Sequence, residues 1–196
     1  MKTTIVNVGY RSTNYWVVSA GRSRVLVDLG WPGTFATLRA TLGRMGVPLE
    51  ELRYGLATHY HIDHAGLAQE LSLAGVSLLV VDLQLPAIPA LAALTKASEG
   101  FIPIDVRKAT VITLEQSRMT LAKIGIDGEI VHTPGHSDDS VSLLLDDGSV
   151  FTGDLTNPAL AGEGDAESEK VAASWNMLRE RGARTVYPGH GPPRPI

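Results

Sequence analysis

The sequence predicts an α/β protein in which two β-sheets pack against each other and helices cover their outer faces. Three observations predict this class. Short runs with strand character dominate the first 30 residues, strand-like and helix-like runs alternate between residues 34 and 97, and strands return after residue 100. This order of meander, βα units, second meander and final βα unit suits a sheet-on-sheet core.

The first quarter of the chain begins with an antiparallel meander and continues into a helix. Polar and glycine-containing turns separate three expected strands, which are Thr4–Val8, Tyr15–Ser19 and Arg24–Leu29. From Thr34 to Met45 the apolar residues recur at helical spacing, and Gly46 followed by Pro48 ends the helix.

The next part alternates between strands and helices, as βα units do. Buried strands are expected over Leu52–Thr58 and Val76–Val81. A helix follows each strand, Asp63–Leu73 after the first and Pro86–Ala97 after the second. A proline at the start of the second helix is a favourable N-terminal signal.

The last part of the chain returns to strands and ends on one more βα unit. The expected strands are Ala109–Leu114, Arg118–Ala122, Glu129–His132, Val141–Leu145 and Val150–Thr152. The polar turn between the last two predicts a hairpin. A helix over Glu167–Glu180 then leads into a final strand around Thr185–Tyr187.

Composition limits the functions that the chain can have. With 196 residues, 44% hydrophobic and 19% charged, residues 1–196 are expected to form a single soluble domain. The chain has no cysteine, so a metal would be held by nitrogen and oxygen. The net charge of −4, without a basic run, argues against a nucleic-acid partner. Because the sequence has no secretory signal and no bilayer-spanning apolar stretch, a cytoplasmic protein without membrane association is expected.

The strongest functional signal is a cluster of three histidines and one aspartate between an expected strand and an expected helix. The cluster consists of His59, His61, Asp63 and His64. Residues two apart in an extended segment point to the same side, so His59 and His61 can chelate one ion. The turn into the helix can direct Asp63 and His64 toward a second ion. Four solvated residues in this arrangement by chance are a poor competing interpretation.

Three further candidate ligands stand at strand ends, each beside a glycine. They are His136, Asp154 and His190. Glycine lets the backbone approach a metal closely, and strand ends present side chains from a rigid sheet with access to solvent. Taken alone, either histidine would more often be a surface residue. The sixth histidine, His132, has no such setting, and we expect it to lie outside the ligand set.

The pattern His-x-His-x-Asp-His, followed by later His, Asp and His, resembles the metal signature of the metallo-β-lactamase superfamily. The resemblance covers residues 59 to 190 and is specific for the superfamily but not for a substrate. It implies a four-layer αββα sandwich with the site at one sheet edge. It also implies two metals, each held by three residues and joined by a bridging carboxylate. The implied sets are His59, His61 and His136 for the first metal, Asp63, His64 and His190 for the second, and Asp154 for the bridge.

Departures from subfamily patterns narrow the field. Class B1 β-lactamases place a cysteine where Asp154 stands, and flavin-coupled di-iron members usually replace the residue at His61 by glutamate and add a flavin domain. The tRNA 3′-processing members carry an RNA-gripping arm, for which no segment is evident. Glyoxalase II is similar in its seven ligands and in the early Asn14-Tyr15 motif, but its C-terminal helical domain is missing. The chain therefore resembles a small, glyoxalase II-like metallo-hydrolase with a single domain.

A binuclear centre of this kind predicts metal-dependent hydrolysis. Two divalent ions can share a hydroxide near neutral pH, and this metal-bridging hydroxide would attack a small ester-like substrate. Asp154 would bridge the ions and Asp63 would orient the hydroxide and relay a proton, so these two are the catalytic candidates. A thioester or lactone is preferred over a phosphodiester, because no basic cluster accompanies the motif. Zinc suits the ligands, and iron and manganese also accept them.

Loops around the ligands are expected to select the substrate. The aromatic candidates for an apolar rim are Tyr10, Trp31 and Tyr60, although aromatic residues more often fill a core. The segment 157–166 is a candidate lid or a connector without a role. Asp28 is a candidate partner of a ligand histidine, and the pair Asp138 and Asp139 is expected to form a solvated turn.

Two other functions remain open. The first is a mononuclear iron dioxygenase resembling the persulfide-oxidising branch, with His59, His136 and Asp154 as iron ligands. The second is a binding or scaffold protein that kept the site, although the complete ligand set argues against it. The expected partner is a small-molecule substrate, and the oligomeric state, with a homodimer among the options, stays open.

Overall fold

The computed structural model describes residues 3–95, 100–158 and 166–196, and in these ranges the strands form two sheets. The six-stranded sheet has the order β1-β2-β3-β4-β5-β6. Its strands are Thr4–Asn7, Trp16–Ala20, Ser23–Val27, Leu52–Leu56, Ser77–Val81 and Thr110–Ile112. The five-stranded sheet has the order β11-β10-β9-β8-β7. Its strands, from β7 to β11, are Gly128–His132, Val141–Leu145, Ser149–Gly153, Thr185–Pro188 and Arg194–Pro195.

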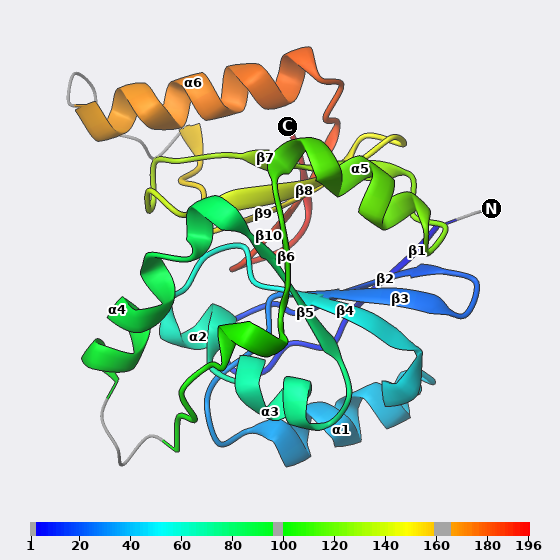
Figure 1. The fold of residues 1–196 in the computed structure, drawn as a ribbon. Coiled ribbons are helices and arrows are strands. Elements are labelled where there is room, and N and C mark those ends of the chain that lie inside the picture. Colours follow the sequence, from blue (N-terminus) through cyan, green and yellow to red (C-terminus); the bar gives the residue numbers. More distant parts are fainter. Residues whose placement is uncertain (1–2, 96–99, 159–165) are drawn as a thin grey trace.

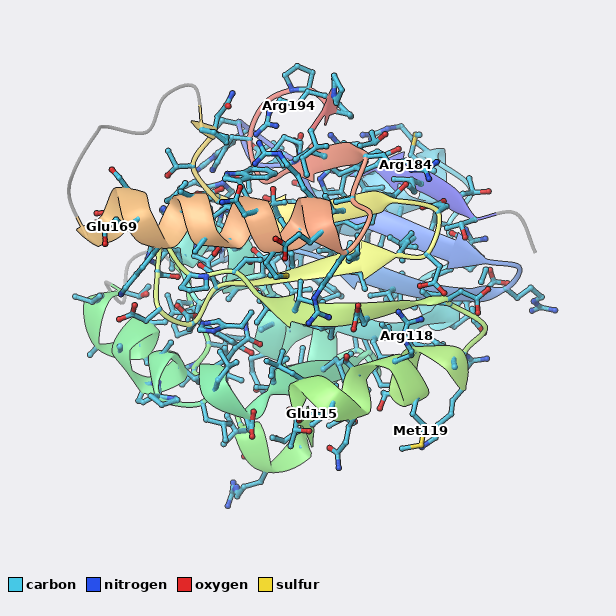
Figure 2. All side chains as sticks on the ribbon, turned by 90° about the horizontal axis from the view of Figure 1, so that it is seen from above. Glu115, Arg118, Met119, Glu169, Arg184 and Arg194 are labelled. Atoms are coloured by element: carbon cyan, nitrogen blue, oxygen red, sulfur yellow. The ribbon has the colours of Figure 1, made fainter. Side chains whose placement is uncertain are left out.

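Helices cover both outer faces of the paired sheets (Figure 1). The described α-helices are α1 (Phe35–Arg44), α2 (Ile62–Ala65), α3 (Ala68–Leu73), α4 (Ala87–Leu94), α5 (Leu114–Ala122) and α6 (Ala166–Glu180). Helices α1 and α3 lie against the six-stranded sheet, and α6 lies over the five-stranded sheet (Figures 1 and 2). This arrangement confirms the predicted α/β class with four layers. None of the helices in the described part of the chain is both long enough and apolar enough to cross a bilayer.

Apolar clusters of described residues fill the spaces between the four layers, and strand residues alternate between clusters. In β2, Val17 packs in the cluster beneath α1 and α3, whereas Trp16 packs in the cluster between the sheets. In β8, Leu143 faces the same inter-sheet cluster, and Leu144 packs with Trp175 of α6. Both faces of these strands are buried, which explains why their sequences read as nearly continuous apolar runs.

A cluster of aromatic side chains joins the two sheets near the end of β10. Trp16 lies 5.1 Å from Tyr187 in an edge-on arrangement, and Tyr187 stacks on Phe151 at 4.9 Å. The indole Nε1 of Trp16 donates a hydrogen bond to the carbonyl oxygen of Pro188 at 3.0 Å. This bond fixes the end of β10 against β2, just before the chain turns toward His190.

The expected strand over Arg118–Ala122 is wrong, because these residues lie in α5. The helix begins with a capping box, in which the side chain of Gln116 accepts a hydrogen bond from the backbone nitrogen of Thr113 at 3.0 Å. One turn later, the hydroxyl of Ser117 accepts a hydrogen bond from the backbone nitrogen of Ile130 at 3.0 Å. The helix therefore lies along the outer edge of β7.

The expected helix over Asp63–Leu73 is divided into α2 and α3. Between them, Gly66 packs so closely on Pro32 that a Cβ at residue 66 would overlap the proline ring. Glycine at this position lets the chain pass the loop that follows β3. The expected helix over Pro86–Ala97 ends at Leu94 as α4, and its last two expected residues lie outside the described ranges.

Candidate metal centre

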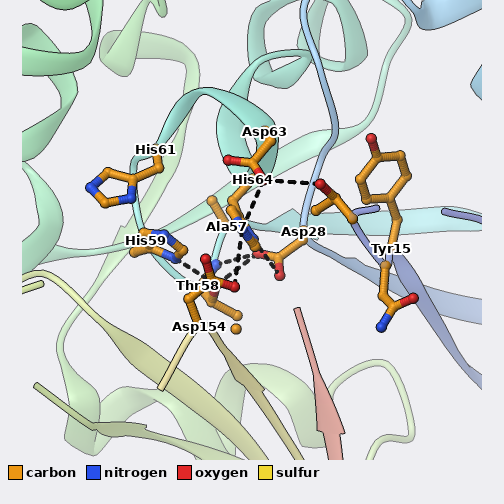
Figure 3. A network of polar contacts seen from close by, with 12 residues as sticks. Tyr15, Asp28, Ala57, Thr58, His59, His61, Asp63, His64 and Asp154 are labelled. Carbon is orange, nitrogen blue, oxygen red and sulfur yellow. Dashed lines mark hydrogen bonds and ion pairs between the residues drawn. The ribbon is translucent and has the colours of Figure 1, made fainter. Parts of the chain in front are cut away.

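The seven predicted ligands follow strands of both sheets and meet at one end of the sandwich. The first sheet contributes His59, His61, Asp63 and His64 after β4, and the second contributes His136, Asp154 and His190 after β7, β9 and β10. Figure 3 shows His59, His61, Asp63, His64 and Asp154 gathered around a common space. The cluster thus lies where the edges of two rigid sheets face each other.

Within the cluster the ligand atoms form three groups, each with its atoms within 4.8 Å of one another. The groups are His59 with His61 and His136, Asp63 with His64 and His190, and His59 with His64 and Asp154. The carboxylate of Asp154 lies 3.3 Å from His64 Nε2, 3.4 Å from His190 Nε2 and 3.8 Å from His136 Nε2. The structure therefore brings together both predicted sets, with Asp154 between them.

The polar atoms at the centre of the cluster fit a bound cation. Among the described residues, His59 Nε2 and Asp154 Oδ1 are buried without a hydrogen-bond partner. An unsatisfied buried polar atom costs roughly 1–3 kcal/mol. Two imidazole nitrogens, His136 Nε2 and His61 Nδ1, also face each other at 3.0 Å. Nitrogen and oxygen donors in this arrangement are typical ligands of zinc and of other first-row divalent ions.

His64 lies at the centre of the negative charge. Its Nδ1 is 2.9 Å from Asp28 Oδ2, and its Nε2 is 3.4 Å from Asp63 Oδ2 and 3.3 Å from Asp154 Oδ1. Burial opposes a charge on this imidazole, but the Asp28 carboxylate and the contacts with Asp154 and Asp63 raise the pKa of His64 well above its usual value. Three carboxylates around one buried ring therefore make a positive charge at this place favourable.

Asp28 is held in place by the end of the neighbouring strand. Its Oδ1 accepts hydrogen bonds from the backbone nitrogen and the hydroxyl of Thr58, both at 2.8 Å. Its φ of 64° lies in the left-handed region, which few residues other than glycine adopt. Asp28 is buried and contacts His64 directly, so the structure places it in the position predicted for a partner of a ligand histidine.

Asp63 is oriented by a residue that the sequence patterns do not indicate. The hydroxyl of Thr13 donates a hydrogen bond to Asp63 Oδ2 at 2.9 Å, and the indole of Trp31 donates to that hydroxyl at 3.2 Å. Burial alone would raise the pKa of Asp63, but His64 and Thr13 outweigh it and hold the pKa far below its usual range. Asp63 therefore keeps its negative charge at neutral pH.

The tautomer of His190 follows from its contact with the loop that carries Thr13. Its Nδ1 lies 2.7 Å from the carbonyl oxygen of Ser12. Because a carbonyl oxygen only accepts, Nδ1 carries the proton in the neutral ring, and the lone pair of Nε2 faces Asp63 at 3.3 Å. His59 is neutral because burial and the neighbouring imidazoles lower the pKa of His59 well below its usual value.

A buried glutamine, also without a sequence signal, joins two ligand loops. The side-chain nitrogen of Gln84 donates hydrogen bonds to the carbonyl oxygens of Ala57 at 3.1 Å and Asp139 at 3.2 Å. The carboxylate of Asp139 accepts a hydrogen bond from the backbone nitrogen of Tyr60 at 2.8 Å. The expectation of a solvated turn therefore holds for the exposed Asp138, but Asp139 instead fixes the loop that carries His59 and His61.

The remaining predicted positions have different surroundings. Tyr10 is 39% exposed and Trp31 is partly buried, whereas Tyr60 is 5% exposed and packs in the core, so Tyr60 does not form an exposed rim. His132 donates a hydrogen bond from Nε2 to the carbonyl oxygen of Asp138 at 2.8 Å, outside the ligand groups of the described residues. Most of the proposed lid at 157–166 lies outside the described ranges.

Cavities lined by candidate ligands adjoin the cluster, and two of them lie on different sides of it. One, of about 310 Å³, is bounded by His61 and Asp63 on one side and by Leu91 and Leu94 of α4 on the other. The second, of about 390 Å³, is lined by three candidate ligands and by residues that follow β9 and β10. Its lining residues are His136, Gly153, Asp154, Leu155, Thr156, Asn157, Pro188, His190 and Arg194. Both volumes fall within the range of small-molecule sites.

Comparison with known proteins agrees with the family that the ligand pattern predicts. The sequence profile of the Metallo-beta-lactamase superfamily matches residues 8–190. The "Beta-lactamase-like protein 2 homolog" of Drosophila melanogaster is 27% identical over 187 residues, which cover 92% of this chain and 59% of that protein. The "Probable metallo-hydrolase MJ0888" of Methanocaldococcus jannaschii is 28% identical over 193 residues, which cover 93% of this chain and 89% of that protein.

A thioesterase and a solved structure are also similar to the chain. The "Atrochrysone carboxyl ACP thioesterase" of Aspergillus fumigatus is 28% identical, over 92% of this chain and 38% of that protein. The crystal structure of TTHA1623 in a di-iron-bound form is 29% identical with a TM-score of 0.70, covering 98% of this chain and 94% of that one. The chain thus spans 59% of the length of the Drosophila protein and 38% of the length of the thioesterase. The profile match runs from β2 and its preceding loop to His190, the last residue of the cluster, and the chain belongs to the metallo-β-lactamase superfamily of metallo-hydrolases.

Proposed function

We propose that the protein is a binuclear metal-dependent hydrolase that cleaves a small ester-like substrate, with thioesters and lactones preferred over phosphodiesters. The observation that carries this proposal is the pairing of two three-residue ligand groups with one carboxylate, Asp154, that lies within 3.8 Å of members of both. The similarity to a protein named as a thioesterase supports the preference for thioesters.

The seven clustered residues have two kinds of task. His59, His61 and His136 would hold one ion, Asp63, His64 and His190 would hold the other, and Asp154 would contact both. A pair of divalent ions at this position supplies an activated water as nucleophile and neutralises the charge that develops on the substrate oxygen. The ligand set includes three imidazoles for one ion and two imidazoles with a carboxylate for the other, which suits zinc and also iron or manganese.

Asp63 would orient the attacking water and carry its proton to the leaving group. One oxygen of its carboxylate is fixed by the hydroxyl of Thr13, and the indole of Trp31 in turn holds that hydroxyl. A carboxylate restrained in this way keeps one orientation, which holds its other oxygen in a fixed position to accept a hydrogen bond from the water. Thr13 and Trp31 are therefore positioning residues in this proposal.

The cavity beside α4 suits an apolar acyl group. Leu91 is buried and Leu94 is 84% exposed, and both line the cavity that His61 and Asp63 bound on the other side. An acyl chain in contact with these leucines would place its carbonyl carbon next to the ligand cluster. This geometry supports an ester or thioester of a small, partly apolar acid.

Metal analysis and substrate hydrolysis test the proposal directly. Purified protein is expected to contain two divalent ions per chain and to hydrolyse members of a panel of chromogenic lactones, thioesters and phosphodiesters, with chelator abolishing turnover. Turnover should continue under anaerobic conditions. One iron per chain with oxygen consumption would instead support the mononuclear dioxygenase, and metal binding without turnover of any panel member would support the binding protein.

Replacing Asp154 by alanine is expected to abolish hydrolysis. The substitution removes the carboxylate between the two groups, and the loss should exceed ~100-fold, since even partners behind the ligands contribute roughly 10- to 100-fold. Activity and bound metal are measured together. Asp127→Ala, at an exposed position remote from the cluster, is the control and should retain both. Unchanged turnover in Asp154→Ala would contradict the assignment of the bridge.

A further inference from the structure

A partly buried arginine lies in the wall of the cavity next to the ligand cluster. Arg194 belongs to β11, and it lines the same cavity of about 390 Å³ as His136, Asp154 and His190. Figure 2 shows Arg194 near α6, and the exposed Arg184, which precedes β10, does not line this cavity. The cavity thus has candidate metal ligands and a guanidinium among its lining groups.

Contacts with α6 fix the position of this guanidinium. Its central carbon lies 5.2 Å from the centre of the Trp175 ring, which is a cation–π distance. Trp175 is fully buried, and its Nε1 donates a hydrogen bond to the carbonyl oxygen of Thr156 at 2.7 Å. Because Thr156 lies two residues after Asp154, the ring that supports Arg194 is bonded to the loop that carries a candidate ligand.

The guanidinium has no carboxylate partner among the residues that the structure describes. Arg181, at the end of α6, contacts Glu129 at 3.1 Å, and Arg24 contacts Glu51 at 3.0 Å, but no such ion pair involves Arg194. Burial without a compensating anion lowers the pKa of Arg194 from its usual value, although a guanidinium stays charged at neutral pH. The planar N–H groups of arginine match carboxylates and phosphates in shape and charge.

We propose that Arg194 binds an anionic group, a carboxylate or a phosphate, on the leaving-group side of the substrate. The inference rests on the proposed function and specifies its substrate class. With the acyl group in the cavity beside α4, the leaving group would extend into the cavity that ends at Arg194. The one carboxylate among the described residues of that lining is Asp154, which belongs to the ligand cluster, so Arg194 is left to attract an anion.

Matched thioesters test this assignment by kinetics. Butyryl thioesters of thiols of equal length, ending in a carboxylate, a phosphate or a neutral carboxamide, are compared with wild-type protein and with Arg194→Gln. The variant is expected to raise KM for the charged substrates by roughly 10- to 100-fold, the contribution of a charge-assisted hydrogen bond, with kcat and the neutral substrate little changed. The carboxylate and phosphate arms show which anion the site prefers.

Two further variants separate binding from structural effects. Arg194→Lys keeps the charge but not the planar donors, so it should recover part of the lost affinity. Arg184→Gln removes an exposed guanidinium away from the cavity and should behave as wild type on all three substrates. Equal effects of Arg194→Gln on charged and neutral substrates, or no effect on any, would overturn the inference and leave the proposed hydrolysis intact.

A titration decides the inference if none of the thioesters is hydrolysed. The Nε–H resonance of Arg194 in ¹⁵N-labelled, metal-loaded protein is assigned by its absence in Arg194→Gln. Glutarate and glycerol 3-phosphate are then added, with glutaramide as the neutral control. A saturable shift with either anion but not with glutaramide would support anion binding while the hydrolase proposal fails. No shift with either anion would overturn the inference.

Discussion

Asp28 acts on the ligand cluster through two neighbours. One carboxylate oxygen faces His64 Nδ1 at 2.9 Å, and the other accepts two hydrogen bonds from Thr58. The hydroxyl of Thr58 also lies 3.1 Å from His59 Nδ1, so one aspartate restrains the rings of two candidate ligands. A residue that fixes ring orientation and basicity in this way contributes to metal affinity although it does not touch the metal.

Replacing Asp28 by asparagine is expected to weaken metal binding by roughly 10- to 100-fold. The amide has nearly the same size and tolerates the left-handed backbone, but it removes the negative charge that faces His64. Competition with a fluorescent chelator measures the affinity. Asp127→Asn, at an exposed site, is the matched control and should bind metal as tightly as wild type. An affinity equal to that of the control would show that the charge of Asp28 does not act on the site.

The sequence alone is sufficient to find some residues of the site and insufficient for others. The seven ligand candidates could be found because four of them fall within six residues and the others stand beside glycine at strand ends. Thr13, Gln84 and Arg194 could not, because threonine, glutamine and arginine are common at ordinary positions. Their roles depend on partners far along the chain, as with Thr13 and Asp63, which are 50 residues apart.

At the scale of elements, the turns after β9 and β10 are packed on each other as well as on the ligands. The backbone nitrogen of Gly189 donates a hydrogen bond to the carbonyl oxygen of Gly153 at 2.7 Å. A Cβ at residue 189 would overlap the carboxylate of Asp154 and lie 2.7 Å from His64 Cε1. Glycine is therefore required here by the space available beside the ligands.

Replacing Gly189 by alanine is expected to lower the number of metal ions bound per chain and to reduce hydrolysis strongly. The added methyl group would displace Asp154 or His64, and overpacking of this kind costs roughly 1–3 kcal/mol in the free energy of unfolding. Metal content, turnover and urea unfolding are measured on the same preparation. An alanine variant with wild-type metal content would show that the two turns separate easily.

Gly43→Ala is the matched control for that substitution. Gly43 lies in α1, and apart from its chain neighbours and the helix's own backbone no atom lies within 4 Å of the position that its Cβ would take. Alanine in a helix is favoured over glycine by roughly 0.5–1 kcal/mol, so this variant should be slightly more stable and fully active.

Periodicity predicts the elements whose burial decides their structure and fails where a local signal is stronger. The strand at Val141–Leu145 and the helix α1 follow from the spacing of apolar residues, because each packs that pattern against a core. Residues 118–122 are helical because the capping box at Thr113 starts a helix that their apolar pattern alone does not indicate. The division between α2 and α3 depends on Pro32, a contact distant in sequence.

At the scale of the whole molecule, the candidate ligands join the two sheets. Four of them follow β4 of the six-stranded sheet, and three follow strands of the five-stranded sheet. Bound ions would therefore cross-link the halves of the sandwich at one end. The apolar cluster between the sheets, which includes Trp16, Leu143 and Phe151, holds them together without any ion.

Metal removal is accordingly expected to lower the unfolding temperature without abolishing the fold. A ligand at 100 times its Kd stabilises a protein by about 2.7 kcal/mol, and more at higher excess. Circular dichroism melts with and without chelator measure the change, and added zinc should reverse it. Equal unfolding temperatures would indicate that the cluster does not bind metal in the folded protein.

The metal-dependent part of this stability should decrease as the pH falls from 7.5 to 5.5. Metal binds deprotonated imidazole, so protons compete with it. The pKa of His64 is raised by its carboxylate neighbours, which means that metal has to displace a proton from this ring even near neutral pH. Lower pH favours the protonated, metal-free form. A chelator-induced change in unfolding temperature that grows toward acidic pH would contradict this direction.

The Trp16 indole, 5% exposed and packed against Phe151 and Tyr187, offers an optical probe of the junction between the two sheets. Separation of β2 from β10 would break its bond to Pro188 and admit water, which shifts indole emission to longer wavelength. With Trp31 and Trp175 replaced by phenylalanine, stopped-flow fluorescence could follow the sandwich opening and closing in real time. The fluorescence of the same indole could show whether this opening and closing slows when zinc is added.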